Sequence, residues 1–118
     1  MPLGPMEPIY HLVARSAWER HPADDYHADS LATEGFIHCS FANQVAWAAN
    51  RFHADTADLI ALEIDPAYLA TPLRVEPPSP GSKSAELFPH IHGPLNRKAV
   101  VAEHPMRRGG DGRWVFLR

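Results

Sequence analysis

Residues 35–40, Gly-Phe-Ile-His-Cys-Ser, place a histidine and a hydroxyl in one short run of alternating character. In an extended strand, successive side chains point to opposite faces. Ile37 and Cys39 then share an apolar face that suits the core, and His38 and Ser40 share the other face. We therefore expect His38 and Ser40 to line the cleft of this protein. Cys39 is expected to be a small buried hydrophobe, because it faces away from the neighbouring imidazole.

Histidine is frequent in this chain, with eight among 118 residues. His11, His38, His90 and His92 differ from the others because each lies in a strand-like segment among apolar residues. Any one of them could be a core histidine with a satisfied hydrogen bond, but several in a small domain favour a shared cleft. Histidine titrates near neutral pH, so His38 and His90 are the candidates to donate or accept a proton.

His90 and His92 also raise the alternative of a metal site. In the run His-Ile-His both imidazoles lie on the same face of a strand. A third imidazole from His11 or His38 would complete a three-histidine site with an open position. His-x-His is a weak pattern, and Pro89 interrupts regular strand geometry. The metal site stays an alternative, and the leading hypothesis below needs no metal.

A helix is expected over residues 41–53, with Ser40 as its N-cap. The free backbone N–H groups at the start of such a helix, together with its dipole, favour a phosphate. His38 and Asn43 could add donors beside that phosphate. The sequence therefore predicts a generic anion site at this helix start.

The segment that leads into the second histidine pair carries a further carboxylate, Glu86. It follows a proline-rich loop at 77–82 that could act as a lid over a site. Residues 87–92 are expected to be extended, and Pro89 predicts an edge or bulged strand. The alternative is an edge segment whose histidines are merely exposed.

The expected elements are short strands and helical turns with a single longer helix. Strands are expected at 9–13, 36–40, 59–64, 73–76, 87–92, 99–103 and 114–117. Helical turns are expected early in the chain, and Gly35 is placed to end one of them in the left-handed conformation. Helices that cluster early and strands that cluster late favour an α+β fold. Trp18, Trp47 and Trp114 are interpreted as packing residues.

Composition and charge are those of one globular domain, expected over residues 9–118 behind a flexible arm at 1–8. The formal charge of −3 argues against an extended nucleic-acid footprint. One cysteine allows no disulfide within the chain and favours a reducing compartment. The sequence contains no apolar run approaching the roughly 20 residues that span a bilayer. We therefore expect a cytoplasmic protein that does not contact membranes.

Several segments together carry a family resemblance. They are Ile9-Tyr10-His11, Ser30-Leu31, Glu34-Gly35-Phe36-Ile37-His38-Cys39-Ser40, Gln44, Leu62-Glu63-Ile64-Asp65, Phe88-Pro89-His90 and Gly93-Pro94-Leu95. They resemble the bacterial and plant domain-of-unknown-function family 952, over residues 9 to 117. The Gly-Phe-Ile-His-Cys-Ser and Phe-Pro-His segments are the most specific.

The fold of that family looks like that of the ADP-ribosyltransferases, in which two small sheets surround a nicotinamide-dinucleotide cleft. A strand with Tyr10-His11, then helices, then a strand with His38 and Ser40 is similar to the opening of the RNA 2′-phosphotransferases. The resemblance implies that His11 contacts the cofactor, and that His38 and Ser40 match the second histidine and hydroxyl of those enzymes. Glu86 is the candidate for the catalytic glutamate of the toxin-like transferases.

The leading hypothesis is an α+β domain with an ADP-ribosylation-like fold, in which two small, mostly antiparallel sheets form a cleft beside one main helix. The cleft would bind NAD, ADP-ribose or a similar small nucleotide, and transferase activity is one hypothesis for it. The assigned residues are His38, His90 and Glu86 as catalytic, and Tyr10, His11, Ser40 and Asn43 as cofactor-binding. The alternatives are a metal-dependent enzyme built on His90, His92 and a third histidine, and a non-catalytic protein-interaction domain.

Overall fold

The computed structural model describes residues 7–117 of the chain. The flexible arm expected at 1–8 falls almost entirely outside the described residues. No helix within 7–117 combines the length and the apolar character needed to cross a membrane.

The elements follow one another along the chain in a mixed order. The strands are β1 (Ile9–Ala14), β2 (Ile37–His38), β3 (Leu59–Ile64), β4 (Leu73–Glu76), β5 (Phe88–Ile91), β6 (Val100–Pro105), β7 (Arg107–Arg108) and β8 (Trp114–Val115). The α-helices are α1 (Arg15–Glu19), α2 (Asp29–Glu34) and α3 (Val45–Phe52). The 3₁₀ turns are η1 (Ala42–Gln44), η2 (Pro66–Tyr68) and η3 (Arg97–Ala99).

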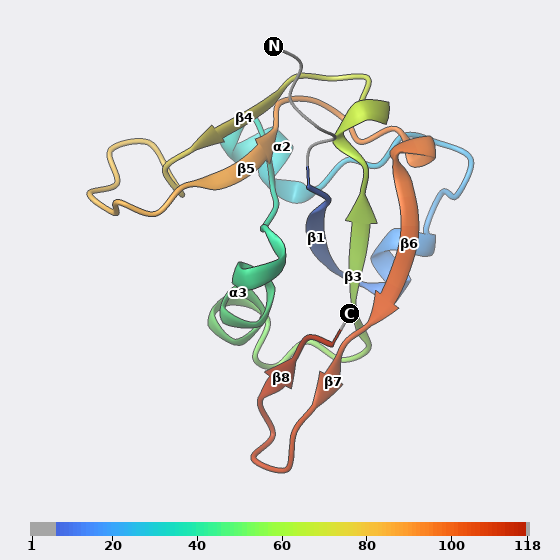
Figure 1. The fold of residues 1–118 in the computed structure, drawn as a ribbon. Helices are drawn as coiled ribbons and strands as arrows, with labels where there is room; N and C mark the ends of the chain where they lie inside the picture. The colour runs from blue at the N-terminus through green and yellow to red at the C-terminus, as the bar shows by residue number, and fades with distance from the viewer. Residues whose placement is uncertain (1–6, 118) are drawn as a thin grey trace.

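Two small antiparallel sheets form the body of the domain. One has the strand order β1-β3-β6, and the other has the order β2-β5-β4. Figure 1 shows β1, β3 and β6 on one side, β4 and β5 on the other, and α3 below the second sheet. A hairpin of β7 and β8 projects from the end of β6. The α+β class, the antiparallel sheets and the one longer α-helix are confirmed.

The two sheets are joined where the chain leaves β2. Tyr10 and Ser40 exchange two backbone hydrogen bonds, each of 2.8 Å, so residue 40 continues the β1-β3-β6 sheet for one position. Beyond that bridge, the free edge of β1 has no partner strand among the described residues. A cleft can therefore open along residues 11–14.

The face assignment of the strand around His38 is confirmed. Ile37 and Cys39 are buried in the core cluster that contains Ile60, Leu62 and Ile64 of β3, whereas the imidazole of His38 is exposed. Burial raises the pKa of the Cys39 thiol, so this cysteine stays protonated and behaves as a small hydrophobe. Gly35 ends α2 with φ of 90°, as expected of a left-handed C-terminal residue.

The helix expected over 41–53 is divided, and the expected cap at Ser40 is wrong. The first turn is the 3₁₀ turn η1, and its N-cap is Phe41. The Phe41 N–H donates to Oε1 of Gln44 at 2.9 Å, so this donor is already used within the chain. The expected phosphate site at this helix start therefore loses its first N–H group.

The expectation of an edge strand around Pro89 is also wrong, because β5 is the central strand of its sheet. The carbonyl of Pro89 accepts the N–H of Cys39 at 3.1 Å, just where the β2 pairing ends at His38 and His90. Since the nitrogen and the carbonyl of a strand residue point to the same side, the missing N–H of Pro89 faces that end. No ladder hydrogen bond is lost toward β4.

Gly93 is required by a close approach to Thr71. A Cβ at residue 93 would lie 2.6 Å from Cγ2 and 2.8 Å from Cβ of Thr71. We predict that Gly93→Ala lowers the free energy of unfolding by about 2 kcal/mol, the usual cost of overpacking. Gly110→Ala is the matched control, because its Cβ would meet nothing within 4 Å. Urea denaturation of both variants checks this, and equal stabilities would contradict it.

Candidate functional site

A cleft of about 1070 Å³ opens along the free edge of β1. One wall is β1 itself, and the facing walls are the segment 20–30 and residues 38–40. The far end is lined by residues of α3 and the turn that follows it. His11, His38 and Ser40, which the sequence assigned to one cleft, all border it.

The imidazole of His11 is held in one tautomer by the backbone. Its Nδ1 lies 2.7 Å from the carbonyl oxygen of His38. Because a carbonyl can only accept, Nδ1 carries the proton and Nε2 offers a lone pair. The hydroxyl of Tyr26 donates to that Nε2 over a long distance of 3.4 Å. His11 therefore presents a fixed hydrogen-bond acceptor beside a phenol.

Burial decides the charge of this pair. His11 is only 7% exposed, and burial lowers its pKa to about 4, although the hydrogen bond to the His38 carbonyl opposes the shift. Burial also raises the pKa of Tyr26 to about 12. Both side chains are neutral at pH 7. A base with a pKa near 4 holds a proton poorly at pH 7, so His11 suits ligand positioning better than proton transfer.

His38 and Glu34 form a pair of ionisable side chains at the rim of the cleft. Nε2 of His38 lies 3.0 Å from Oε2 of Glu34, a residue of α2 that also borders the cleft. The left-handed turn at Gly35 brings these two side chains together. A carboxylate that orients an imidazole in this way is a common arrangement for general acid–base chemistry.

Aromatic rings are exposed at the far end of the cleft. Trp47 and Phe52, both on α3, are 54% and 65% exposed, and their rings meet edge to face with centroids 5.8 Å apart. The ring of Phe88 lies 5.9 Å from that of Trp47. The expected packing role of Trp47 is wrong, whereas Trp18 and Trp114 are buried as expected.

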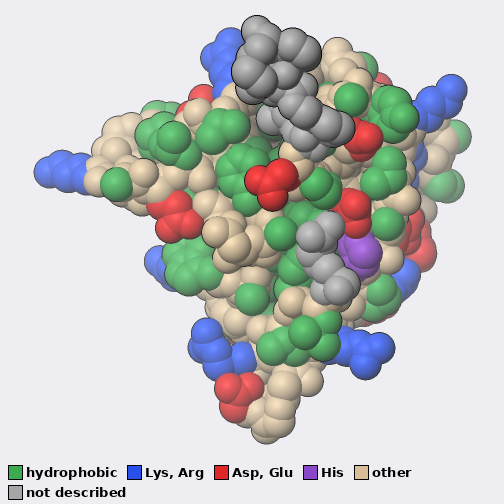
Figure 2. Space-filling model, viewed as in Figure 1, with side chains coloured by type: hydrophobic (Ala, Val, Ile, Leu, Met, Phe, Trp, Pro, Cys, Tyr) green, Lys and Arg blue, Asp and Glu red, His purple; other side chains and the backbone are tan. Residues whose placement is uncertain are grey.

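Charge around the cleft is mixed but predominantly acidic. The acidic side chains that border it are Asp24, Asp25, Asp29 and Glu34, and the arginines are Arg20 and Arg97. The Arg97 guanidinium already donates to backbone carbonyls of the segment 18–24. On the face shown in Figure 2, basic side chains are scattered and form no extended patch.

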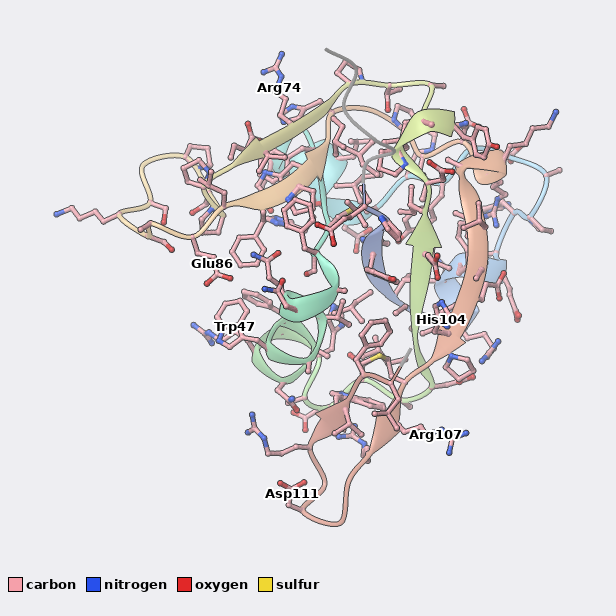
Figure 3. All side chains as sticks on the ribbon, viewed as in Figure 1. Trp47, Arg74, Glu86, His104, Arg107 and Asp111 are labelled. Atoms are coloured by element: carbon pink, nitrogen blue, oxygen red, sulfur yellow. The ribbon has the colours of Figure 1, made fainter. Side chains whose placement is uncertain are left out.

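The other assigned residues lie in different surroundings. Ser40 and Tyr10 border the cleft, but the side chain of Tyr10 is fully buried and packs edge-on against Phe116. Asn43 is exposed and does not border the cleft. Glu86 is also outside it, where its Oε2 accepts from Nε2 of Gln44 at 2.9 Å. Figure 3 shows Glu86 near Trp47, on the outer side of the molecule.

His90 is fully buried and does not border the cleft; it belongs to a second cluster with Glu76 and His92. Its Nδ1 lies 2.8 Å from Oε2 of Glu76, and Nε2 of His92 lies 2.7 Å from the same oxygen. Burial lowers the pKa of His90, and its hydrogen bond to Glu76 opposes that shift. Burial would raise the pKa of Glu76, but the hydrogen bonds from both imidazoles outweigh it and lower the pKa.

Neither His11 nor His38 supplies a third nitrogen to the His90–His92 pair. The sequence hypothesis of a three-histidine site is replaced by two histidines and Glu76, which together form the His/Cys/Asp/Glu group found among residues 7–117. The signal for Glu76 was its place at the end of the strand 73–76. Glu76 could be assigned to the histidine cluster only with the knowledge that the strand 73–76 pairs with residues 88–91.

Tyr26 was also missed, because it lies in a polar loop without periodicity. Its backbone N–H and carbonyl pair with Leu95 at 2.8 and 2.9 Å, and this bridge fixes the loop against the core. The contact between Nε2 of His104 and Oε1 of Glu63, at 2.7 Å, could not be predicted from the sequence either. Figure 3 shows His104 on the β1-β3-β6 sheet, away from Glu86 and Trp47.

Comparison with known proteins identifies the family. The model of the family described as "Protein of unknown function (DUF952)" matches residues 12–103, which is most of the chain. The chain belongs to the DUF952 family. The part of the sequence-based resemblance that named this family is confirmed.

Solved structures of one other protein resemble this DUF952 chain over nearly its full length. The crystal structure of protein CC0527 from Caulobacter crescentus is 27% identical, with a TM-score of 0.74, and covers 92% of this chain and 93% of that one. The crystal structure of a double mutant of CC0527 gives 26% and 0.74 with the same coverage. The solution structure gives 26% and 0.71, covering 92% and 91%. No curated protein matches the chain.

Proposed function

We propose that the cleft along β1 binds a nicotinamide dinucleotide or a closely related nucleotide, in an ADP-ribosyltransferase-like arrangement of the two sheets. The observation that carries the proposal is the combination, in one cleft, of a buried neutral acceptor at His11 with exposed aromatic rings on α3. The volume of about 1070 Å³ lies just above the usual range for small-molecule pockets, which suits a dinucleotide.

The aromatic end of the cleft suits a base. A nucleobase stacked on an aromatic side chain gains about 1–3 kcal/mol. Trp47 is about half exposed, and the rings of Phe52 and Phe88 flank it. The adenine of the ligand would lie on Trp47.

The polar end of the cleft suits the second nucleoside. The long hydrogen bond between Tyr26 and Nε2 of His11 can be exchanged for a shorter one from an amide N–H or a hydroxyl of the ligand. Carboxylates of the segment 24–29 can accept from ribose hydroxyl groups. His11 therefore acts as a positioning residue in this proposal.

The acidic balance of the cleft distinguishes between related nucleotides. NAD carries a positive charge on its nicotinamide ring that ADP-ribose and NADH lack. The four acidic side chains around the cleft outnumber the two arginines, one of which is committed to the backbone. We expect NAD to bind more tightly than either of the other two.

His38 is the proton acceptor in this proposal. In transfer from NAD, the bond between ribose and nicotinamide breaks and a bond forms from the same ribose carbon to an acceptor nucleophile. The proton that the nucleophile loses would pass to the imidazole of His38, oriented by Glu34 at 3.0 Å. Glu86 lies outside the cleft lining, so the proposal gives it no role in this step.

The proposal is tested by calorimetric titration of the purified chain with NAD, NADH and ADP-ribose. We expect NAD to bind at least about tenfold more tightly than ADP-ribose, a difference of about 1.4 kcal/mol. Trp47→Ala should weaken NAD binding by about tenfold through lost stacking. Tyr68→Ala is the matched control, because Tyr68 is also exposed but does not border the cleft.

Two results would contradict the proposal. One is the absence of heat at millimolar concentrations of all three nucleotides. The other is binding that Trp47→Ala and Tyr68→Ala weaken to the same extent, because the ligand would then lie elsewhere.

A further inference from the structure

Two imidazoles and a carboxylate converge on one point beside the antiparallel pair of β4 and β5. Nδ1 of His90, Nε2 of His92 and a carboxylate oxygen of Glu76 all lie within 4.8 Å of one another. The Glu76 oxygen is 2.8 and 2.7 Å from the two nitrogens. A tetrahedral ion about 2.0–2.2 Å from each donor needs donor atoms roughly 3.3–3.6 Å apart, so the two hydrogen-bonded contacts would open by roughly 0.6 Å to admit it.

We propose that Glu76, His90 and His92 bind a divalent transition-metal ion, with zinc as the first candidate. Two imidazoles with one carboxylate are a donor set that zinc and other first-row metals use in proteins. In the metal-free form each imidazole donates an N–H to the same oxygen. On binding, each of these nitrogens would present its lone pair to the ion, and the ring proton would move to the opposite nitrogen. None of the three ligands borders the nucleotide cleft, although Glu34 borders both the cleft and the cavity beside the cluster. The metal proposal does not depend on nucleotide binding.

The ligands are held in place before any ion arrives. His90 is fully buried, and the ring of Phe36 stacks on it at 4.1 Å with an interplanar angle of 16°. The Nε2 of His90 is sealed within the protein without a hydrogen-bond partner, so Nδ1 is the nitrogen that this ring offers to the cluster. Phe36 also contacts the ring of His92 at 5.3 Å.

Strand pairing supplies the third ligand. His90 and His92 share one face of the β5 segment, and β4 runs antiparallel beside it with Glu76 opposite Phe88. Glu76 is therefore the diagonal neighbour of His90, within reach of a long side chain. Arg74, which pairs with His90, is exposed and extends away from the body of the molecule in Figure 3.

The site has room for a further ligand. A cavity of about 350 Å³ adjoins it, lined by Glu76, His92, Phe36, Glu34 and the loop from Pro77 to Gly81. Three protein ligands beside an open cavity resemble a catalytic zinc site more than a closed structural one. Water or a small anionic substrate would occupy the fourth position. The proline-rich loop, interpreted from sequence as a lid, forms the outer wall of this cavity.

The test uses the full chain without an affinity tag, stripped with a chelator and then titrated with zinc or cobalt chloride. We expect one equivalent of zinc to bind, and cobalt to give the visible absorption of a low-coordinate nitrogen and oxygen site. Glu76→Gln and His92→Ala should each weaken zinc binding by more than the 10- to 100-fold that outer-sphere changes cause. Both residues are half-buried, so these variants are safer for folding than one at His90.

Glu63→Gln is the matched control. Glu63 and His104 form a pair of the same length, 2.7 Å, and similar exposure, but no second imidazole joins them. This variant should bind zinc as the parent chain does. The proposal is overturned if the parent chain binds no zinc at micromolar concentrations, or if Glu76→Gln binds zinc as tightly as Glu63→Gln.

Discussion

The free energy of unfolding is expected to fall by about 3 kcal/mol between pH 7 and pH 4 through His11 alone. The pKa of this imidazole is about 4 in the folded chain, and about 6.5 when the chain is unfolded. Between these values the unfolded chain binds more protons than the folded one, so stability is complete above pH 6.5 and is lost as the pH falls. At 1.36 kcal/mol per pH unit, the difference at pH 4 is about 3 kcal/mol.

His11→Gln isolates this contribution. A glutamine amide can still donate to the carbonyl of His38, but it does not titrate. Urea denaturation of both chains at pH 7, 5.5 and 4 should show a smaller pH dependence in the variant by about 3 kcal/mol. If the two curves run parallel, the imidazole of His11 is not held neutral by burial.

Replacing Arg97 by Met is expected to cost about 3 kcal/mol of stability and to weaken nucleotide binding about tenfold. The guanidinium donates to the carbonyls of Trp18 and Asp24 at 2.9 and 2.7 Å and lies over the indole of Trp18 at 3.9 Å. Hydrogen bonds to a charged donor contribute about 1.5–3 kcal/mol, and the cation–π contact about 1 kcal/mol. Without Arg97, the segment 18–24 that walls the cleft loses its anchor.

Two other variants separate anchoring from charge. Arg97→Lys keeps the charge but not the planar fork, so we expect an intermediate loss of stability. Arg74→Met removes an exposed arginine away from the cleft and should change neither stability nor affinity. Denaturation and calorimetry on the three variants check these expectations. Full affinity in Arg97→Met would show that the segment 18–24 does not shape the binding site.

The alternation of apolar and polar residues was sufficient to predict which side chains around His38 face the core. The period of two along a strand assigns Ile37 to the core and His38 to the opposite face, and burial bears this out. The end of α2 at Gly35 was predicted equally well, because a left-handed conformation costs glycine less than any residue with a Cβ atom. These features depend on a few neighbouring residues only.

The helix after Ser40 could not be placed correctly by a period of 3.6. The 3₁₀ turn at Ala42–Gln44 has about three residues per turn, so it changes the phase of the helix that follows. Within α3, Val45, Ala48 and Ala49 face the core, and Trp47 lies off that face. Phe52 has the spacing of the core face, but it is the last residue of the helix, where it borders the cleft and is exposed. The ring of Trp47, expected to pack in the core, therefore lies exposed at the cleft.

Site features that join distant segments could not be derived from one sequence. The central place of β5 depends on pairing with strands at residues 37 and 75. The carboxylate of Glu76 joins the two histidines only through that pairing. The expected edge strand at Pro89 was wrong for the same reason, because the missing N–H faces the end of β2.

The most direct test of the nucleotide proposal is a map of backbone amide shifts on adding NAD to the labelled chain. We predict that the largest shifts occur within residues 10–14, 20–28, 38–40 and 47–53, which border the cleft. The shifts should reach half of their maximum at the dissociation constant from calorimetry. Shifts confined to the β4–β5 sheet, or no shifts at millimolar NAD, would contradict the proposal that the cleft along β1 is a nucleotide site.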